Sequence, residues 1–260
     1  MGHSRYGYMP DTAPWREVIA LIADGSAVAK IADATLDAAQ RGLKLAYDDP
    51  GLGYAAYLLS KVVLAARESN FQAALSTAGI SVSANPGLLD VVGGFSQAMD
   101  QHLRRTGART DIGEMAQLAA VESLTSLVGE RSTSLFGTTA AEVKSGVREL
   151  STMNGFGTLA HDFFARVTER FLTYHLSREL SCHVGPNERF KSVSEHTGFL
   201  GELRNHCRQA ALIVQKFAAG WYSKAKFEDG ISQRKAQNFA NYALKKLRDE
   251  MRVRRERGVD

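Results

Sequence analysis

The longest regular pattern of apolar and polar positions lies between Gly198 and Gly230. Apolar residues recur there at alternating intervals of three and four residues, which places them along one side of about six turns of helix. These positions are Leu200, Leu203, Cys207, Ala210, Val214, Phe217 and Trp221. Charged and amide residues fall between them, so the pattern predicts an amphipathic helix whose apolar side lies in a core.

Similar spacing predicts helices along most of the chain. A proline after two aspartates, at Asp48, Asp49 and Pro50, is typical of a helix boundary. The alternating residues 79–84 have no second strand to pair with, so we expect a link there. The further predicted helices cover residues 17–23, 26–47, 52–77, 85–105, 111–128, 138–150, 159–180 and 232–256. The predicted fold is all-α, with about eight helices in a two-part helical bundle and no substantial sheet.

The apolar pattern lapses between Gly129 and Gly137, where Ser, Thr, Arg and Glu predominate. A short capping sequence follows, so this lapse is the predicted boundary between two helical parts. We expect an N-terminal tail over residues 1–14, an N-terminal helical part over 15–130, and a C-terminal helical part over 138–256.

Composition indicates an ordinary globular protein. Of 260 residues, 44% are hydrophobic and 23% are charged, so neither disorder nor a disulfide-dependent core is indicated. The most apolar run, residues 54–66, contains Lys61 and is too short to span a bilayer. Cys182 and Cys207 are the two cysteines, which excludes a disulfide framework and favours a reducing compartment. We therefore expect a cytoplasmic protein with no membrane partner.

Positive charge is concentrated at the C-terminal end. Residues 232–260 hold nine Lys or Arg against four Asp or Glu, while the net charge of the whole chain is +4. Several of these cations share one arc of about 80° on the predicted final helix, a pattern that suits a phosphate backbone or an acidic protein. The residues are Arg234, Lys245, Arg248, Arg252 and Arg255. The turn before this helix also resembles a helix-turn-helix in outline.

No metal or cofactor site is predicted. The candidate zinc ligands are Cys182, His183, His196, His206 and Cys207. They lack a cysteine pair with zinc-binding spacing, and Cys207 lies on the apolar stripe, where a thiol behaves as a small hydrophobe. Two glycine patterns of the dinucleotide-binding type begin at Gly51 and Gly155, but no strand precedes either. They are interpreted as helix breaks.

Three Arg–His spans resemble the spacing in HEPN ribonucleases, which are all-helical and independent of metal. They run from Arg170 to His175, from Arg178 to His183, and from Arg189 to His196. In such an enzyme the His acts as general acid or base, and the Arg stabilises the phosphorane charge. A polar residue, Glu179, follows Arg178, so Arg178 and His183 are the candidate catalytic pair. Chance alone is expected to produce about two such spans, and the matched residues are too few to assign a family.

The sequence contains no nucleophile elbow, zinc-protease helix or phosphate-binding loop. We therefore predict a non-catalytic helical interaction subunit, an adaptor that binds a protein partner in a larger cytoplasmic assembly. One alternative is a nucleic-acid-binding protein that uses the basic final helix. The other is a HEPN-like ribonuclease that uses Arg178 and His183.

Overall fold

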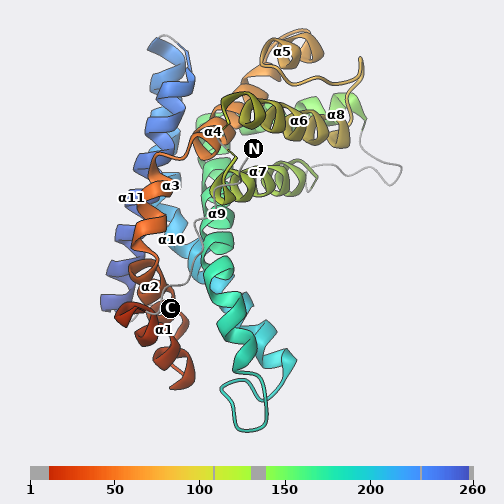
Figure 1. The fold of residues 1–260 in the computed structure, drawn as a ribbon. Helices are drawn as coiled ribbons and strands as arrows, with labels where there is room; N and C mark the ends of the chain where they lie inside the picture. Colours follow the sequence, from red (N-terminus) through yellow and green to blue (C-terminus); the bar gives the residue numbers. More distant parts are fainter. Residues whose placement is uncertain (1–11, 108, 130–138, 229, 258–260) are drawn as a thin grey trace.

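A computed structural model describes residues 12–107, 109–129, 139–228 and 230–257, and within these ranges the chain forms eleven α-helices and no strand (Figure 1). The predicted all-α fold is confirmed. The helices are α1 (Ala13–Ala23), α2 (Val28–Ala38), α3 (Gln40–Tyr47), α4 (Pro50–Ala65), α5 (Phe71–Thr77), α6 (Leu88–Thr106), α7 (Asp111–Gly129), α8 (Ala140–Leu150), α9 (Met153–Cys182), α10 (Val193–Glu228) and α11 (Gln233–Arg257).

The predicted number of about eight helices is wrong because two predicted helices are each divided. The segment 26–47 leaves helical geometry at Ala39, which separates α2 from α3. The segment 52–77 is interrupted before Asn70, whose side chain accepts a hydrogen bond from the backbone N of Ala73 at 2.9 Å and caps α5. Apolar periodicity continues through both breaks, so it does not reveal them. Asn70, a residue type that favours the N-cap position, was the sequence signal that could have revealed the second break.

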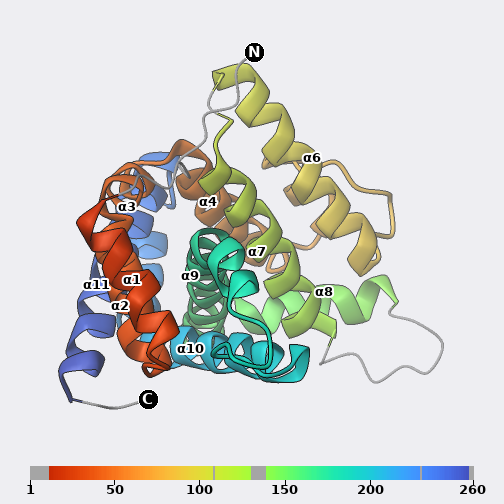
Figure 2. The ribbon, with the colours of Figure 1, turned by 60° about the horizontal axis from the view of Figure 1, so that its bottom comes forward.

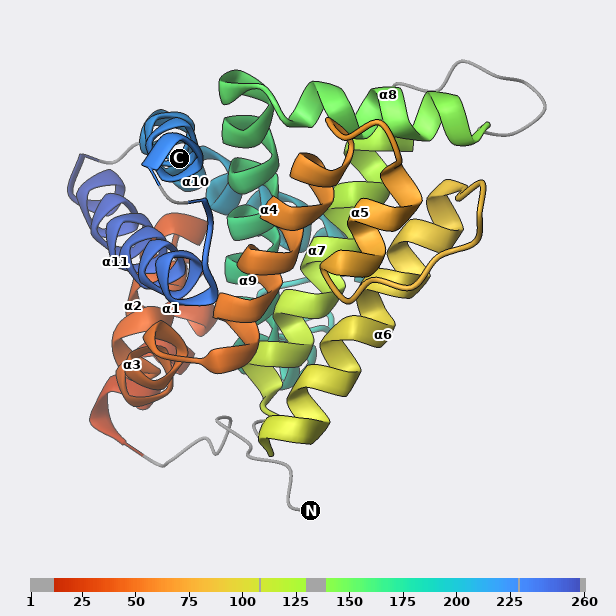
Figure 3. The ribbon, with the colours of Figure 1, turned by 90° about the horizontal axis from the view of Figure 1, so that it is seen from above.

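The centre of the molecule is the antiparallel pair α9 and α10, whose connecting loop extends beyond the other helices (Figure 1). Helix α4 packs against α7 on one side and α11 on the other, and α5 and α6 lie beyond α7 and α4 in the view from above (Figure 3). Helix α2 contacts α9, α10 and α11. Buried side chains from all eleven helices form one continuous apolar core.

Two helix starts meet at a buried polar contact between α4 and α7. Asp49 accepts a hydrogen bond from the backbone N of Leu52 at 2.9 Å, and its other carboxylate oxygen accepts one from Thr110 Oγ1 at 2.6 Å. Thr110 in turn accepts from the backbone N of Gly113 at 2.9 Å. A Cβ on Gly51 would lie 2.6 Å from the Cα of Gly113, so the two backbones touch here. Gly51, interpreted from the sequence as part of a helix break, is a close-packing position inside α4.

The predicted boundary between the parts runs from Gly129 to Gly137, and all of it except Gly129, which ends α7, lies outside the described residues, as do residues 1–11 of the predicted tail. Within the described ranges, none of the helices combines the length and the apolar character needed to cross a bilayer.

Candidate functional site

Arg178 and His183, the candidate catalytic pair, lie at the end of α9 without contacting each other. The Arg178 side chain is exposed, and its backbone carbonyl accepts a hydrogen bond from Cys182 Sγ at 3.4 Å. His183 Nδ1 lies 3.5 Å from Glu188 Oε2. Within the described ranges no hydrogen bond or ion pair joins Arg178 to His183, since a spacing of five residues separates side chains by about 140° around a helix.

Arg189, which begins another Arg–His span, holds the α9–α10 loop against α1. Its guanidinium donates to the carbonyl oxygens of Ile22 at 3.1 Å and Ser26 at 2.8 Å, at the C-terminal end of α1. It also lies 4.9 Å from the ring centre of Phe199. Burial lowers the pKa of Arg189. The guanidinium therefore acts as a C-terminal cap for α1.

The basic residues predicted on the final helix lie on the flank of α11 that faces α2 and α3. Arg248 is paired with Asp37, and Arg255 Nη1 lies 2.6 Å from Asp33 Oδ2. Lys245 Nζ lies 5.3 Å from the ring centre of Tyr47. Arg252 Nη2 lies 4.0 Å from Asp249 Oδ1 on the same helix, and the side chain of Arg234 is exposed. Two of the five cations thus have intramolecular ion pairs with α2.

The opposite flank of α11 forms an exposed surface with α10, here called the aromatic seam: Phe217 and Trp221 of α10 with Tyr242 and Lys246 of α11. The rings of Phe217 and Tyr242 are 4.9 Å apart, and Lys246 Nζ lies 5.6 Å from the Tyr242 ring centre. Tyr242 is 48% exposed. Trp221 stacks at 4.2 Å on Phe239, a core residue, so the seam is attached rigidly to the core.

The exposed surface continues towards the C-terminal end of α10. Phe227 is 92% exposed, and the side chain of Lys224 is 76% exposed. Lys216, Gly220, Lys224 and Phe227 share the outward side of α10, because they are spaced by three or four residues. Aromatic rings and lysines therefore alternate along one face of two long helices. The apolar pattern of α10 placed Phe217 and Trp221 on its core side, and both are partly buried against α11. Phe227 lies outside that pattern, so the pattern did not predict this exposed surface.

A second surface, here called the arginine notch, is a hollow of about 450 Å³ between α7, α9 and α10. Figure 2 shows α9 nearly end-on, with α7 and α10 on two sides of it. The lining residues are Met115, Glu122, Arg166, Glu169, Arg170, Thr173, Tyr174, Ser177 and Arg204. The Arg–His spacing did not reveal this site, because the partners of its arginines are the glutamates Glu122 and Glu169. The available signal was the interval of four residues that separates Arg166, Arg170 and Tyr174.

Glu122 of α7 holds two arginines of the notch. One carboxylate oxygen accepts from Arg166 Nη1 at 3.2 Å, and the other accepts from Arg170 Nη2. Arg166 Nε also lies 2.6 Å from Oδ2 of Asp162, whose side chain is buried. Arg204 Nε donates to Glu169 Oε1 at 2.9 Å. Asp162 also pairs with Arg208, so the whole network holds four guanidinium groups against three carboxylates, which leaves one positive charge in excess.

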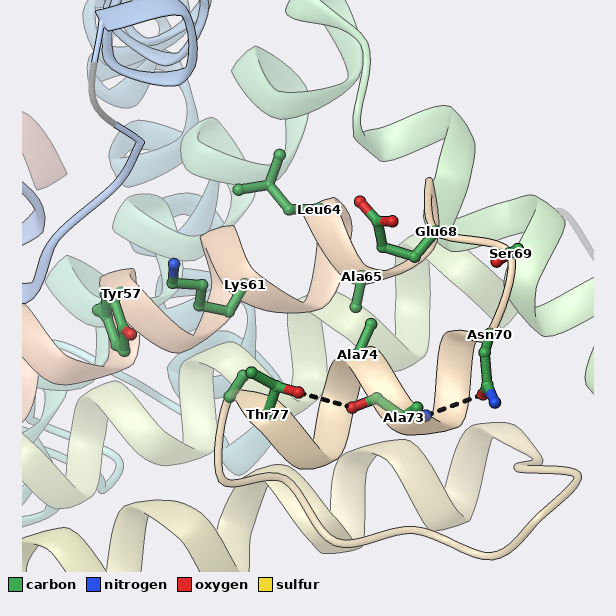
Figure 4. Close-up of a pocket in the computed structure, with 11 residues that line it drawn as sticks. Tyr57, Lys61, Leu64, Ala65, Glu68, Ser69, Asn70, Ala73, Ala74 and Thr77 are labelled. Atoms are coloured by element: carbon green, nitrogen blue, oxygen red, sulfur yellow. Dashed lines mark hydrogen bonds between the residues drawn. The ribbon is translucent and has the colours of Figure 1, made fainter.

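A larger hollow of about 630 Å³ lies between α4 and α5, but its polar groups do not converge (Figure 4). Asn70 caps α5, and Thr77 Oγ1 donates to the carbonyl of Ala73 at 3.0 Å. Figure 4 shows Lys61 and Glu68 pointing away from α5. We regard this groove as a consequence of packing two helices with small side chains, despite its volume.

Reactive side chains are dispersed. Cys207 is buried, and burial raises the pKa of its thiol. Across the described ranges, no three His, Cys, Asp or Glu side chains gather closely enough to hold a metal ion.

Comparisons with protein-family models, curated proteins and solved structures return no match to this chain. Functional inference therefore depends on the geometry of these surfaces.

Proposed function

We propose that this chain is a non-catalytic adaptor subunit of a larger cytoplasmic assembly, and that it binds an acidic amphipathic helix of a partner protein through the aromatic seam. The observation that carries the proposal is the partly exposed row of aromatic rings and lysines along α10 and α11, in which Tyr242 and Phe227 are the exposed rings. Aromatic side chains on rigid elements are typical of the energetic centres of protein interfaces.

The chemistry of the seam favours this kind of occupant. Phe217 and Trp221 are partly buried and already ordered by contact with α11, so binding costs little side-chain entropy. Lys246 lies beside the Tyr242 ring, and Lys224, 76% exposed and 3.8 Å from Glu228, follows Trp221 by three residues on α10. These lysines favour acidic residues around an apolar anchor. An amphipathic helix that lies along the exposed sides of α10 and α11 satisfies both requirements.

Nucleic-acid binding is the alternative that shares these features, because bases stack on aromatic rings near cations. Three observations favour a protein. Trp221 has one face covered by Phe239, and Lys246 lies over the Tyr242 ring. On the other flank of α11, Arg248 and Arg255 are paired with aspartates, which reduces the positive charge available to phosphates. The ribonuclease alternative gains no support from the positions of Arg178 and His183.

The test uses the full chain with a photo-crosslinking amino acid at position 242, expressed in the native host. We expect a crosslinked partner from position 242 and none from Leu89, which is 83% exposed on α6 and serves as the control position. With the purified partner, Tyr242→Ala combined with Phe227→Ser should weaken binding at least tenfold, and Leu89→Ala should leave it unchanged.

Three outcomes would overturn the proposal. Equal crosslinking from positions 89 and 242 would show that the seam is not selective. Unchanged affinity in the double variant would show that the rings are not used. Recovery of RNA or DNA rather than protein from position 242 would identify the nucleic-acid alternative.

A further inference from the structure

We infer that the arginine notch is a second binding site, separate from the aromatic seam, for a small organic oxyanion that carries phosphate or several carboxylate groups. Its volume of about 450 Å³ is within the range of small-molecule sites. Three of its nine lining residues are arginines, whose guanidinium groups bind phosphate and carboxylate oxygens in a forked geometry.

The notch is more than an ion-pair network that joins helices. Such a network ordinarily satisfies its own charges and hydroxyls, and it leaves no hollow in front of them. Here three arginines face two glutamates across an open volume. Among the described residues, the side-chain hydroxyls of Thr173 and Ser177 have no hydrogen-bond partner. These groups supply the positive charge and the hydrogen-bond donors that an oxyanion requires.

Glu122 occupies the position that a ligand would take. Its side chain is 45% exposed and bridges Arg166 and Arg170, as a bound carboxylate or phosphate would do. Arg166 retains Asp162 if Glu122 withdraws, whereas Arg170 has Glu122 as its ion-pair partner within the described ranges. An incoming oxyanion therefore competes with Glu122 mainly for Arg170, and it also reaches Arg204, whose side chain is 61% exposed.

This competition predicts opposite effects for two substitutions. Glu122→Gln removes the internal competitor and one negative charge while keeping the side-chain shape, so it should strengthen oxyanion binding about tenfold. Arg170→Met removes the guanidinium but keeps much of the apolar stem, so it should weaken binding about tenfold or more.

The experiment is calorimetric titration of the full chain with inorganic pyrophosphate and, separately, with citrate. Binding of pyrophosphate alone would indicate a phosphorylated ligand, and binding of citrate alone would indicate a polycarboxylate. Glu68→Gln and Arg148→Met make the same charge changes at exposed positions outside the notch, and both should leave the affinity unchanged. If Arg170→Met fails to fold by circular dichroism, Arg204→Met replaces it.

The inference is overturned if Glu122→Gln shows no saturable binding of either probe up to about 10 mM. It is also overturned if Arg148→Met weakens binding as much as the arginine substitutions in the notch, since the effect would then be general charge attraction. Neither result bears on the aromatic seam, because the two sites share no residue.

Discussion

His175 is a buried imidazole on α9, 5% exposed, in contact with the rings of Phe171 and Tyr174. Its Nε2 atom is buried without a hydrogen-bond partner among the described residues. Burial disfavours the charged imidazolium and lowers the pKa of His175 from 6.5 to about 4, although nearby Asp111 acts in the opposite direction. The folded protein therefore holds this residue in its neutral form at physiological pH.

The titration of His175 should make the free energy of unfolding depend on pH. Because its folded-state pKa is below its unfolded value, the unfolded chain binds a proton between pH 6.5 and about 4 while the folded chain does not. His175 should therefore reduce the free energy of unfolding by up to roughly 3 kcal/mol as pH falls through that window.

His175→Leu should remove this acid-dependent loss of stability while changing the free energy of unfolding at pH 7.5 by about 1 kcal/mol or less, because no hydrogen bond of Nε2 is lost. Urea unfolding at pH 7.5, 6 and 5 measures the effect. His161→Gln, at a partly exposed position of α9, is the control and should unfold with the wild-type pH dependence. Parallel curves for His175→Leu and wild type would contradict the assignment.

Sequence spacing placed His175 in an Arg–His span, and in the same way it placed Arg189 in another. In the structure both residues have packing roles: His175 lies inside the core, and Arg189 caps the C-terminal end of α1. The spacing of two residues along a helix fixes the angle between their side chains about the helix axis. It does not determine which residues of other helices pack against those side chains. Residue roles of this kind could not be predicted without the tertiary arrangement.

Helix α11 joins the body through two chemically different sides. The side that faces the core carries residues that are all buried: Ala236, Phe239, Ala240, Ala243, Leu247 and Met251. Its basic flank meets α2, where Asp33 is fully buried beside Arg255. Burial raises the pKa of Asp33, while Arg255 lowers it, with a net increase. The periodicity of α11 contains no information about acidic partners on a helix about 200 residues earlier, so these ion pairs were not predictable.

The Asp33–Arg255 pair gives a prediction for the α2–α11 contact. Arg255→Met leaves the Asp33 carboxylate buried without its nearest counter-charge, so it should destabilise the protein at pH 7 by roughly 1–3 kcal/mol, since Arg255 itself is partly hydrated. Asp33→Asn combined with Arg255→Met should recover most of this loss, because the buried charge is then absent.

Urea unfolding of the four members of this double-mutant cycle measures the coupling. The pH dependence adds a second readout. Since the folded-state pKa of Asp33 is above its ordinary value of 3.8, its contribution to stability is present below pH 3.8 and is lost as pH rises through the folded-state pKa. That component should be absent in Asp33→Asn. If Asp33→Asn changes the free energy of unfolding by the same amount in the wild-type and Arg255→Met backgrounds, the pair is not coupled.

At the scale of the whole molecule, helices from the two predicted parts are interleaved. Helix α4 of the first part packs on α11 of the second, and α2 of the first packs on α9 and α10. The core is continuous across both. A division of the chain near residues 130–138 remains a prediction, because a lapse in apolar pattern marks a break between helices as readily as one between domains. We expect the described helices to unfold in a single cooperative transition.

The α4–α11 contact allows this expectation to be tested with one added methyl group. A Cβ on Gly53 of α4 would lie 3.1 Å from the Cα of Gln237 on α11, and closer still to that side chain. Gly53→Ala should therefore force the two predicted parts apart and lower the free energy of unfolding by roughly 1–3 kcal/mol. Gly93→Ala on α6 is the matched control, because its Cβ meets nothing within 4 Å. It should stabilise the protein by about 0.5–1 kcal/mol, since alanine favours a helix interior.

The two tryptophans of the chain report on the two parts separately, with Trp15 on α1 and Trp221 on α10. In single-tryptophan variants, Trp15→Phe and Trp221→Phe, the fluorescence midpoints in urea should coincide. Adding Gly53→Ala should shift both midpoints downwards by the same amount, because disruption of one interface weakens a core that both parts share. If the two parts are independent units, the midpoints separate and Gly53→Ala does not move them together. That result would support the boundary near residues 130–138 as a domain division.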